Sequence, residues 1–145
     1  MDMPPLTPPR REDIDHLNLL SVFHYVVGAL GFLFACFPLI HVTVGWMMIH
    51  HPDTMWGNHG AHPPAFAGHL FMIMGSMFVL SGWAMAALTI VSGRMISRRT
   101  HRLFSVVIAA ILCAFLPFGT ILGVFTIIVL SRDSVRQLYA NGRPA

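Results

Sequence analysis

Histidine and methionine are the side chains of this sequence that could bind a metal ion. The 145 residues include 9 His and 10 Met. Imidazole nitrogen together with thioether sulfur is a ligand set for copper, above all Cu(I), and imidazole alone also suits zinc or haem iron. The candidate metal ligands all fall between residues 41 and 69: His41, His50, His51, His59, His62, His69, Met47 and Met55.

The spacing of these histidines is loose and matches no known metal-binding motif. His50 and His51 are adjacent, and the later pair His59 and His62 lies in a segment rich in Pro and Gly. A bis-imidazole haem requires one His from each of two helices at the same depth, and His41 with His69 is the pair that fits. We expect these residues to form a polar loop that hydrogen-bonds water and lipid headgroups, with no cofactor; a copper or haem site is the alternative.

Patterns of side chains that catalyse reactions are missing from the sequence. It contains no Gly-rich phosphate loop after a strand and no H-E-x-x-H motif, and no Asp or Glu lies within its long apolar runs. Intramembrane catalysis and carboxylate-driven transport both rely on acids at depth. We therefore expect a protein that is not an enzyme. His24 lies inside an apolar run, where we expect an interhelical hydrogen bond, with a proton relay as the alternative.

The elements that carry these residues are long and apolar. Between Asp15 and Arg94 the sole charged side chain is Asp53. Two apolar runs cover about residues 17–49 and 65–92, and a third follows Arg102. Each exceeds the ~20 residues that a helix needs to cross a hydrocarbon layer of ~30 Å. The sequence therefore predicts an all-α integral membrane helical bundle whose solvent is the lipid bilayer.

The placement of arginine indicates an orientation. Arg10 and Arg11 precede the first run, the segment 94–102 carries four more arginines, and the loop 50–64 has none. Cytoplasmic loops of membrane proteins carry such an excess of basic residues. We expect a bacterial cytoplasmic (inner) membrane protein with both termini in the cytoplasm. Its arginines then meet anionic lipids, and nucleic acid is not an expected partner.

The third apolar run has two interpretations. One long helix would place the last arginines on the outer side, whereas Pro117 and Gly119 in its middle favour a turn. We expect a short hairpin with helices over 103–116 and 118–131, which gives two long spans plus a C-terminal helical hairpin, four helices in all. A single kinked helix, and hence three spans, is the alternative. Residues 1–16 are expected to be a flexible cytosolic tail and 132–145 a second cytosolic tail.

Glycines mark the expected helix–helix contacts. Gly68, Gly75 and Gly82 recur every seven residues, which favours a left-handed crossing with close backbone approach. Small residues at the other contacts are Gly28, Gly31, Gly119 and Gly123. These faces pack either within the bundle or against a partner subunit. Pro38 should kink the first span or interrupt its hydrogen bonds.

The segment 117–126 reads PFGTILGVFT. It resembles the last helix of a group of small, uncharacterised bacterial multi-pass membrane proteins, in which this element reads P-x-G-T-x-L-G-x-[FY]-T. The segment 19–25 (LLSVFHY) and the arginine-rich stretch before the third run look similar to some members, so that the resemblance covers about half of the chain. It implies an inner-membrane protein with a terminal hairpin and brings no assigned activity.

The sequence thus predicts a non-catalytic accessory or structural protein of the membrane. Its expected partners are the lipid bilayer and either another membrane protein or further copies of the same chain. The alternative is a protein that binds copper or haem at an outward-facing site rich in His and Met.

Overall fold

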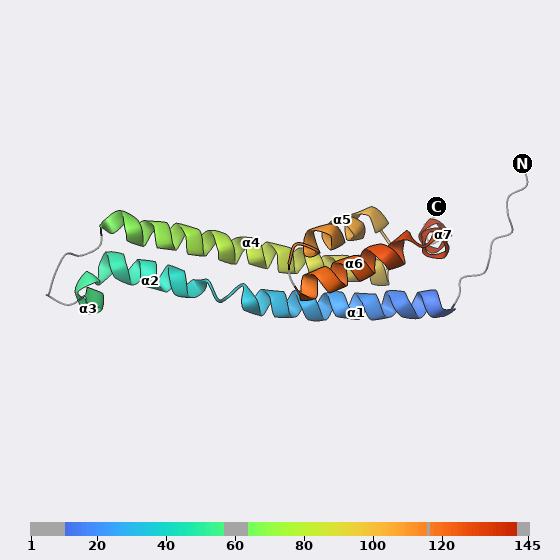
Figure 1. Ribbon diagram of the computed structural model, residues 1–145, viewed down its shortest axis with the longest axis horizontal. Coiled ribbons are helices and arrows are strands. Elements are labelled where there is room, and N and C mark those ends of the chain that lie inside the picture. Colours follow the sequence, from blue (N-terminus) through green and yellow to red (C-terminus); the bar gives the residue numbers. More distant parts are fainter. Residues whose placement is uncertain (1–10, 57–63, 116, 142–145) are drawn as a thin grey trace, which may run out of the picture. The chain divides into compact units, whose positions relative to one another are not determined.

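The computed structural model describes residues 11–56, 64–115 and 117–141, and all of its regular elements there are helices. The prediction of an all-α fold is confirmed. In chain order the helices are α1 (Arg11–Phe34), α2 (Leu39–His50), α3 (Pro52–Trp56), α4 (Ala65–Ser97), α5 (Arg102–Leu112), α6 (Phe118–Ser131) and α7 (Asp133–Asn141) (Figure 1).

The chain divides into two compact units. Unit 1 comprises Met1–Ala29 together with Ala87–Ala145, and unit 2 comprises Leu30–Ala86. The long helices α1 and α4 each contribute to both units. Unit 1 also holds α5, α6 and α7, whereas unit 2 holds α2 and α3.

Two stretches of the described chain are long and apolar enough to cross a membrane, Arg11–His50 and Phe66–Ser97. A third candidate is the bent pair Phe118–Ser131 and Asp133–Ala140, whose two parts make an angle of 73°. Most side chains of the two long stretches face outward, since 11% and 17% of their most apolar windows are buried. This is the surface expected of helices whose outer solvent is lipid.

In unit 2, glycines of α4 lie directly against the neighbouring helical segment. A Cβ atom at Gly68 would stand 2.7 Å from Cγ1 of Ile49, and one at Gly82 would stand 2.6 Å from Cβ of Ala35. Real Cβ atoms essentially never come so close. Only glycine therefore allows the backbones to approach to this distance, and van der Waals contact of this kind holds helices together in lipid.

The first span is interrupted between α1 and α2, as predicted from Pro38. Proline has no backbone N–H to donate, and the turn over residues 35–38 uses shorter i→i−3 bonds. The N–H of Phe37 bonds the carbonyl of Phe34 at 3.0 Å, for example, and that of Leu39 bonds Cys36 at 3.0 Å. The Cys36 thiol donates to the carbonyl of Phe32 at 3.4 Å, which the backbone N–H of Cys36 leaves free for it.

In unit 1, α1 and α4 are joined by a buried hydrogen bond. The Ser21 hydroxyl donates to the carbonyl of Gly93 at 2.8 Å. A Cβ at Gly93 would stand 2.8 Å from Cβ of His24, so this glycine also allows close approach. The side chains of Leu17, Leu20 and His24 on this part of α1 are at most 2% exposed. These contacts fix the first half of α1 against the last turns of α4.

The third apolar run folds into a hairpin of α5 and α6, as the interpretation from Pro117 and Gly119 predicted (Figure 1). A Cβ at Gly119 would stand 2.6 Å from the carbonyl oxygen of Leu112, and one at Gly123 would overlap the carbonyl of Ala109. The Thr120 hydroxyl donates to the carbonyl of Cys113 at 2.8 Å and closes the turn. Close backbone contact therefore runs along the hairpin.

Both ends of the described chain differ from the expectation of tails. Residues 11–16 belong to α1, and Asp133–Asn141 form α7 within the segment expected to be a tail. Val135 is fully buried and Tyr139 is 9% exposed. The apolar contacts of Val135 and Tyr139, four residues apart on one face of the helix, thus hold α7 in unit 1. The short polar segment gives no clear sequence pattern that would predict them. Residues 1–10 and 142–145 lie outside the described residues.

Candidate functional site

His41 faces α4 in unit 2. Its Cβ lies 3.0 Å from the position that a Cβ on Gly75 would take, and its ring stacks on Phe71 with centroids 5.9 Å apart. The Nδ1 atom is buried and has no hydrogen-bond partner among the described residues. His41 is therefore a packed side chain with one ring nitrogen left over.

His50 and His51 lie at the end of α2. The His50 ring stacks on Trp46 with centroids 3.9 Å apart, and its Nδ1 lies 3.2 Å from the Trp46 carbonyl. His51 is exposed, and its backbone N–H bonds the carbonyl of Met47 at 2.8 Å as the helix ends. Both imidazoles thus sit at an exposed helix end, and Met47 is 40% exposed there.

His69 lies on α4, one residue after Gly68 and two residues before Phe71. Gly68 faces Gly45 and Ile49, whereas His41 faces Gly75 with its Cβ and stacks its ring on Phe71. The pairing of His41 with His69 as ligands of a bis-imidazole haem stays a prediction.

The remaining candidate ligands are not placed. His59 and His62 lie outside the described residues, as does the side chain of Met55. Within the part of the chain that the structure describes, no group of three His, Cys, Asp or Glu side chains could hold a metal ion. The copper or haem site therefore stays a prediction.

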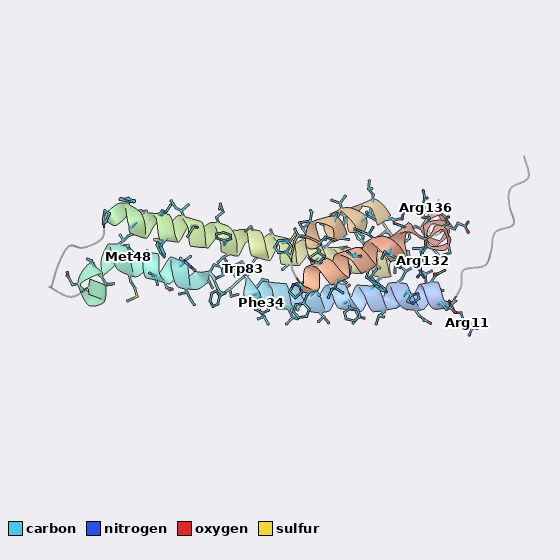
Figure 2. The ribbon with its side chains drawn as sticks, in the orientation of Figure 1. Arg11, Phe34, Met48, Trp83, Arg132 and Arg136 are labelled. Carbon is cyan, nitrogen blue, oxygen red and sulfur yellow. The ribbon has the colours of Figure 1, made fainter. Side chains whose placement is uncertain are left out.

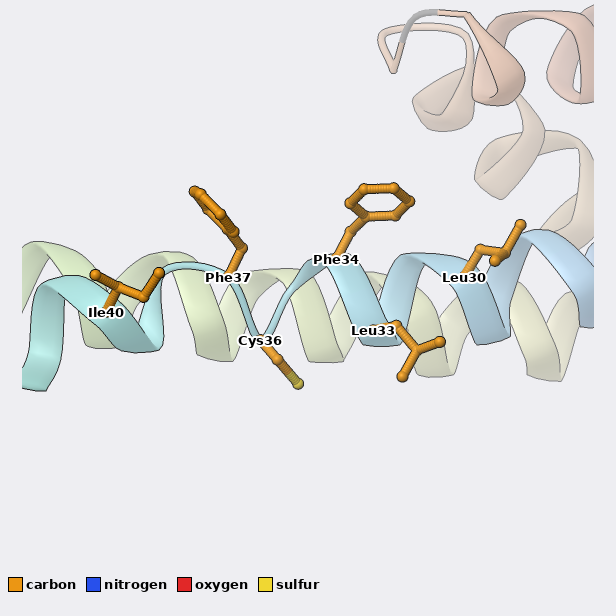
Figure 3. A pocket seen from close by; sticks show the side chains of 6 residues that line it. All are labelled: Leu30, Leu33, Phe34, Cys36, Phe37 and Ile40. Atoms are coloured by element: carbon orange, nitrogen blue, oxygen red, sulfur yellow. The ribbon is translucent and has the colours of Figure 1, made fainter.

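An apolar hollow of about 510 Å³ runs along the helix break in unit 2 (Figure 3). Its exposed rims are the rings of Phe34 and Phe37, 75% and 68% exposed, which point to the same side of the chain in Figure 3. The lining residues are Leu30, Leu33, Phe34, Cys36, Phe37 and Ile40. The interruption at Pro38 is predicted from the sequence, but this surface is not, because the identity of aromatic residues beside a proline does not indicate which way their side chains point.

His24 is fully buried in unit 1. Its Nδ1 lies 2.9 Å from the carbonyl oxygen of Leu20, one turn earlier in the same helix. A carbonyl oxygen only accepts, so Nδ1 carries the proton and Nε2 is the acceptor. No described group bonds Nε2. The expected interhelical hydrogen bond of His24 is absent among the described residues, and Ser21 makes the interhelical bond in its place.

Arginines gather at one end of unit 1. Arg132 pairs with Asp13 at 3.5 Å, which joins the start of α1 to the residue after α6. In Figure 2 the labelled side chains of Arg11, Arg132 and Arg136 all lie at this end. Arg136 pairs with Asp133 on the exposed side of α7, also at 3.5 Å. The hairpin of α5 and α6 makes this possible, because it returns the chain to the end from which it started.

A second, polar hollow lies between the start of α5 and α7. Its volume is about 590 Å³, and its lining consists of Arg102, Asp133, Arg136, Gln137 and Ala140. The Arg102 Nε donates to the carbonyl of Leu130 at 2.7 Å, which fixes the guanidinium at the end of α6. The hollow was not predicted from the sequence, because residues 132–145 were expected to form a tail.

Tyr139 lies on the buried side of α7. No described group hydrogen-bonds its hydroxyl. Burial raises the pKa of Tyr139 to about 12, and the positive charges of Arg102 and Arg99 act in the opposite direction. Both guanidiniums therefore lie near enough to the phenol for their charge to be felt.

Comparison of the chain with family models, with curated proteins and with solved structures finds no match. The resemblance of residues 117–126 to a group of small bacterial membrane proteins consequently stays a prediction.

Proposed function

We propose that this chain is a small, non-catalytic multi-pass protein of the bacterial inner membrane that acts as an accessory or structural partner of another membrane protein. The observation that carries the proposal is the outward apolar surface of the two long helical stretches, of whose most apolar windows 11% and 17% are buried. Lipid covers such a surface, and an apolar helix of a partner can replace lipid there.

The polar side chains inside the apolar helices support a structural role. Ser21 bonds the backbone of α4, Thr120 bonds the hairpin turn, and Thr126 bonds the Leu122 carbonyl of its own helix at 2.6 Å. Polar groups at membrane depth often mark pathways for ions or substrates. Here these three hydroxyls have backbone partners: Ser21 joins α1 to α4, Thr120 closes the hairpin turn and Thr126 bonds within α6.

The hollow at the helix break is the surface that we assign to a partner. Association of helices in lipid depends on van der Waals packing between complementary surfaces. A straight apolar helix has an even surface with few features for a partner to fit, whereas here the rings of Phe34 and Phe37 project beside a hollow. A transmembrane helix of the partner, lying between these rings, is the proposed occupant.

The arginines support the proposed orientation. Those that the structure describes belong to unit 1, at the ends where α1 and α5 begin and where α4 and α6 finish. A concentration of basic residues at one end is the pattern of the cytoplasmic side. We therefore propose that this end of unit 1 faces the cytoplasm, together with both termini.

Site-specific photo-crosslinking in native membranes tests the accessory role. The crosslinking amino acid is placed at Phe37, with Ile73 of α4 as the matched control, because the two side chains are 68% and 67% exposed. We expect one membrane protein to be captured from position 37 and not from position 73, and its abundance to fall in cells that lack the chain. Capture of nothing but lipid from both positions would refute the proposal.

A copper or haem protein is the second candidate function. The observation that favours it is the buried Nδ1 atom of His41, which lacks a hydrogen-bond partner among the described residues. Metal analysis and visible absorbance of the protein purified in mild detergent test it, followed by titration with Cu(I). A colourless, metal-free protein that takes up no Cu(I) would exclude this candidate.

A further inference from the structure

The polar hollow of unit 1 has the composition of an anion site. Two guanidiniums, those of Arg102 and Arg136, and the amide of Gln137 line it, against a single carboxylate, that of Asp133. Arginine offers a planar fork of N–H donors that matches the oxygens of a phosphate group. The hollow therefore presents more donors and more positive charge than its own residues neutralise.

Arg102 is held in place for this role. Its Nε is already bonded to the Leu130 carbonyl at 2.7 Å, so the plane of the guanidinium is fixed while its two terminal nitrogens remain for a ligand. Among the described residues, no carboxylate forms an ion pair with Arg102. The guanidinium is half-buried, and a half-buried cation gains from an anion that completes its contacts.

Arg136 and Asp133 form the outer side of the hollow. Their side chains are 60% and 89% exposed, and the 3.5 Å contact between them is a weak surface ion pair. An anion can therefore take over the Arg136 guanidinium with little loss. Asp133 points largely into solvent, where its repulsion of a bound anion is screened.

The position of the hollow indicates where the anion comes from. α6 is apolar and ends at Ser131, and α7 makes an angle of 73° with it. On α7 the apolar side chains Val135 and Tyr139 are buried, while Arg136 and Gln137 are exposed. An apolar helix followed by a sharply bent polar helix marks the place where the chain leaves the hydrocarbon, so the hollow lies at the level of the lipid headgroups.

We propose that the hollow between α5 and α7 binds one phosphate group, that of an anionic phospholipid, between the guanidiniums of Arg102 and Arg136. The site is independent of the accessory role proposed above, since it lies in unit 1 and needs no protein partner. It goes beyond general attraction of basic residues to lipid, because it names two of the arginines and excludes the others.

Lipid retention by the full-length protein tests the site. The chain is reconstituted in nanodiscs of phosphatidylcholine with a small fraction of phosphatidylglycerol, and the lipids retained after release are counted by native mass spectrometry. We expect one retained phosphatidylglycerol per chain, and about tenfold weaker retention in Arg102→Gln and in Arg136→Gln, the loss expected for one charge-assisted contact. Arg98→Gln removes the same charge from an exposed arginine outside the hollow and should retain the lipid.

A second arm distinguishes lipid phosphate from free phosphate. Inorganic phosphate is titrated into the delipidated protein, and binding is followed by phosphorus NMR. If inorganic phosphate binds and its binding depends on both arginines, the site exists and its ligand is soluble phosphate. If phosphatidylglycerol is retained and inorganic phosphate does not bind, the ligand is the lipid. Arg136 is exposed, so Arg136→Gln decides the matter if Arg102→Gln fails to fold. Equal losses in all three variants, or no preference for phosphatidylglycerol over phosphatidylcholine, would overturn the proposal.

Discussion

Gly45 is the position in α2 where one added methyl group should do most damage. A Cβ there would stand 2.6 Å from the carbonyl oxygen of Gly68 and 2.9 Å from the backbone nitrogen of Met72. These are backbone atoms of α4, which cannot turn aside as the end of a side chain can. The substitution Gly45→Ala therefore has to push α2 away from α4.

The geometry gives the size of the effect. Ordinary contacts of a Cβ begin at about 3.4 Å, so the added atom lies about 0.8 Å too deep at the Gly68 oxygen. Overpacking of this kind costs about 1–3 kcal/mol, while alanine gains at most about 1 kcal/mol over glycine through helix propensity. We expect Gly45→Ala to lower the free energy of unfolding by about 1–2 kcal/mol.

Gly31→Ala is the matched control. The nearest atom to its added Cβ would be Cβ of Ala86 at 3.9 Å, an ordinary contact. This variant should be neutral or up to about 1 kcal/mol more stable. Titration of the purified protein from mild detergent into SDS, followed by circular dichroism and by tryptophan fluorescence, measures both, because all three tryptophans lie between residues 30 and 86 of the sequence. Trp83 stacks on Phe32 with centroids 5.2 Å apart and so reports on unit 2. Equal stability of the two variants would refute the close-contact reasoning.

Three further predictions concern unit 1. Ser21→Ala removes the bond to α4 and should cost about 0.6 kcal/mol, up to about 1.7, in the same SDS titration, with Ser21→Thr retaining most of it. Tyr139 should ionise near pH 12 in an ultraviolet absorbance titration of the Tyr25→Phe variant, and a midpoint near pH 10 would contradict its burial. The packing of α7 should lose stability as the pH rises from 10 to 12, because the tyrosine of a detached α7 releases its proton near pH 10 while the buried tyrosine keeps its proton. Arg132→Gln leaves the buried Asp13 without its counter-charge and should destabilise the protein by about 1 kcal/mol or more. Arg136→Gln removes the partner of the exposed Asp133 and should change stability by less than about 0.5 kcal/mol. Equal effects of the two variants would contradict the difference in burial between Asp13 and Asp133.

Only part of the contact face of α4 could be predicted from the sequence. Gly68, Gly75 and Gly82 stand out because small residues are rare enough to show a period of seven. Val79 lies between Gly75 and Gly82 and Ala86 follows Gly82; each is 4% exposed, and neither was singled out. In water the buried face of a helix is the apolar one, but in lipid every face is apolar. The small size of a side chain then remains the main sign of a helix–helix contact, and apolar residues of ordinary size do not indicate which face is buried.

The candidate sites were harder to predict than the fold, for two physical reasons. The register of α2 against α4 decides whether His41 and His69 meet, and register depends on contacts that the identity of a histidine does not reveal. The polar hollow depends on α7, which is too short and polar to be recognised from a pattern and is held by the burial of Val135 and Tyr139. The interruption at Pro38 was legible because the missing N–H is a property of one residue.

The break at Pro38 leaves the register of unit 2 unchanged. At the first residue of the break Ala35 faces Gly82, and after the break Val42 faces Gly75 and Ile49 faces Gly68. Seven residues along one segment always correspond to seven along α4, so the turn neither adds nor skips a position on the packed face. The break therefore changes the outward face, where it raises Phe34 and Phe37, while the glycine contacts on the inner face continue.

This separation makes Pro38→Ala a decisive variant. Alanine restores the missing N–H and removes a residue that costs a helix interior about 3 kcal/mol, so the protein should be as stable as the parent chain or more stable in SDS titration. An extra alanine inserted after Cys36 shifts every later contact by one position and should instead destabilise unit 2. If the outward surface at the break exists for a partner helix, Pro38→Ala should abolish crosslinking from Phe37 while the fold remains. Crosslinking that survives in a straightened helix would show that the partner recognises something other than the break.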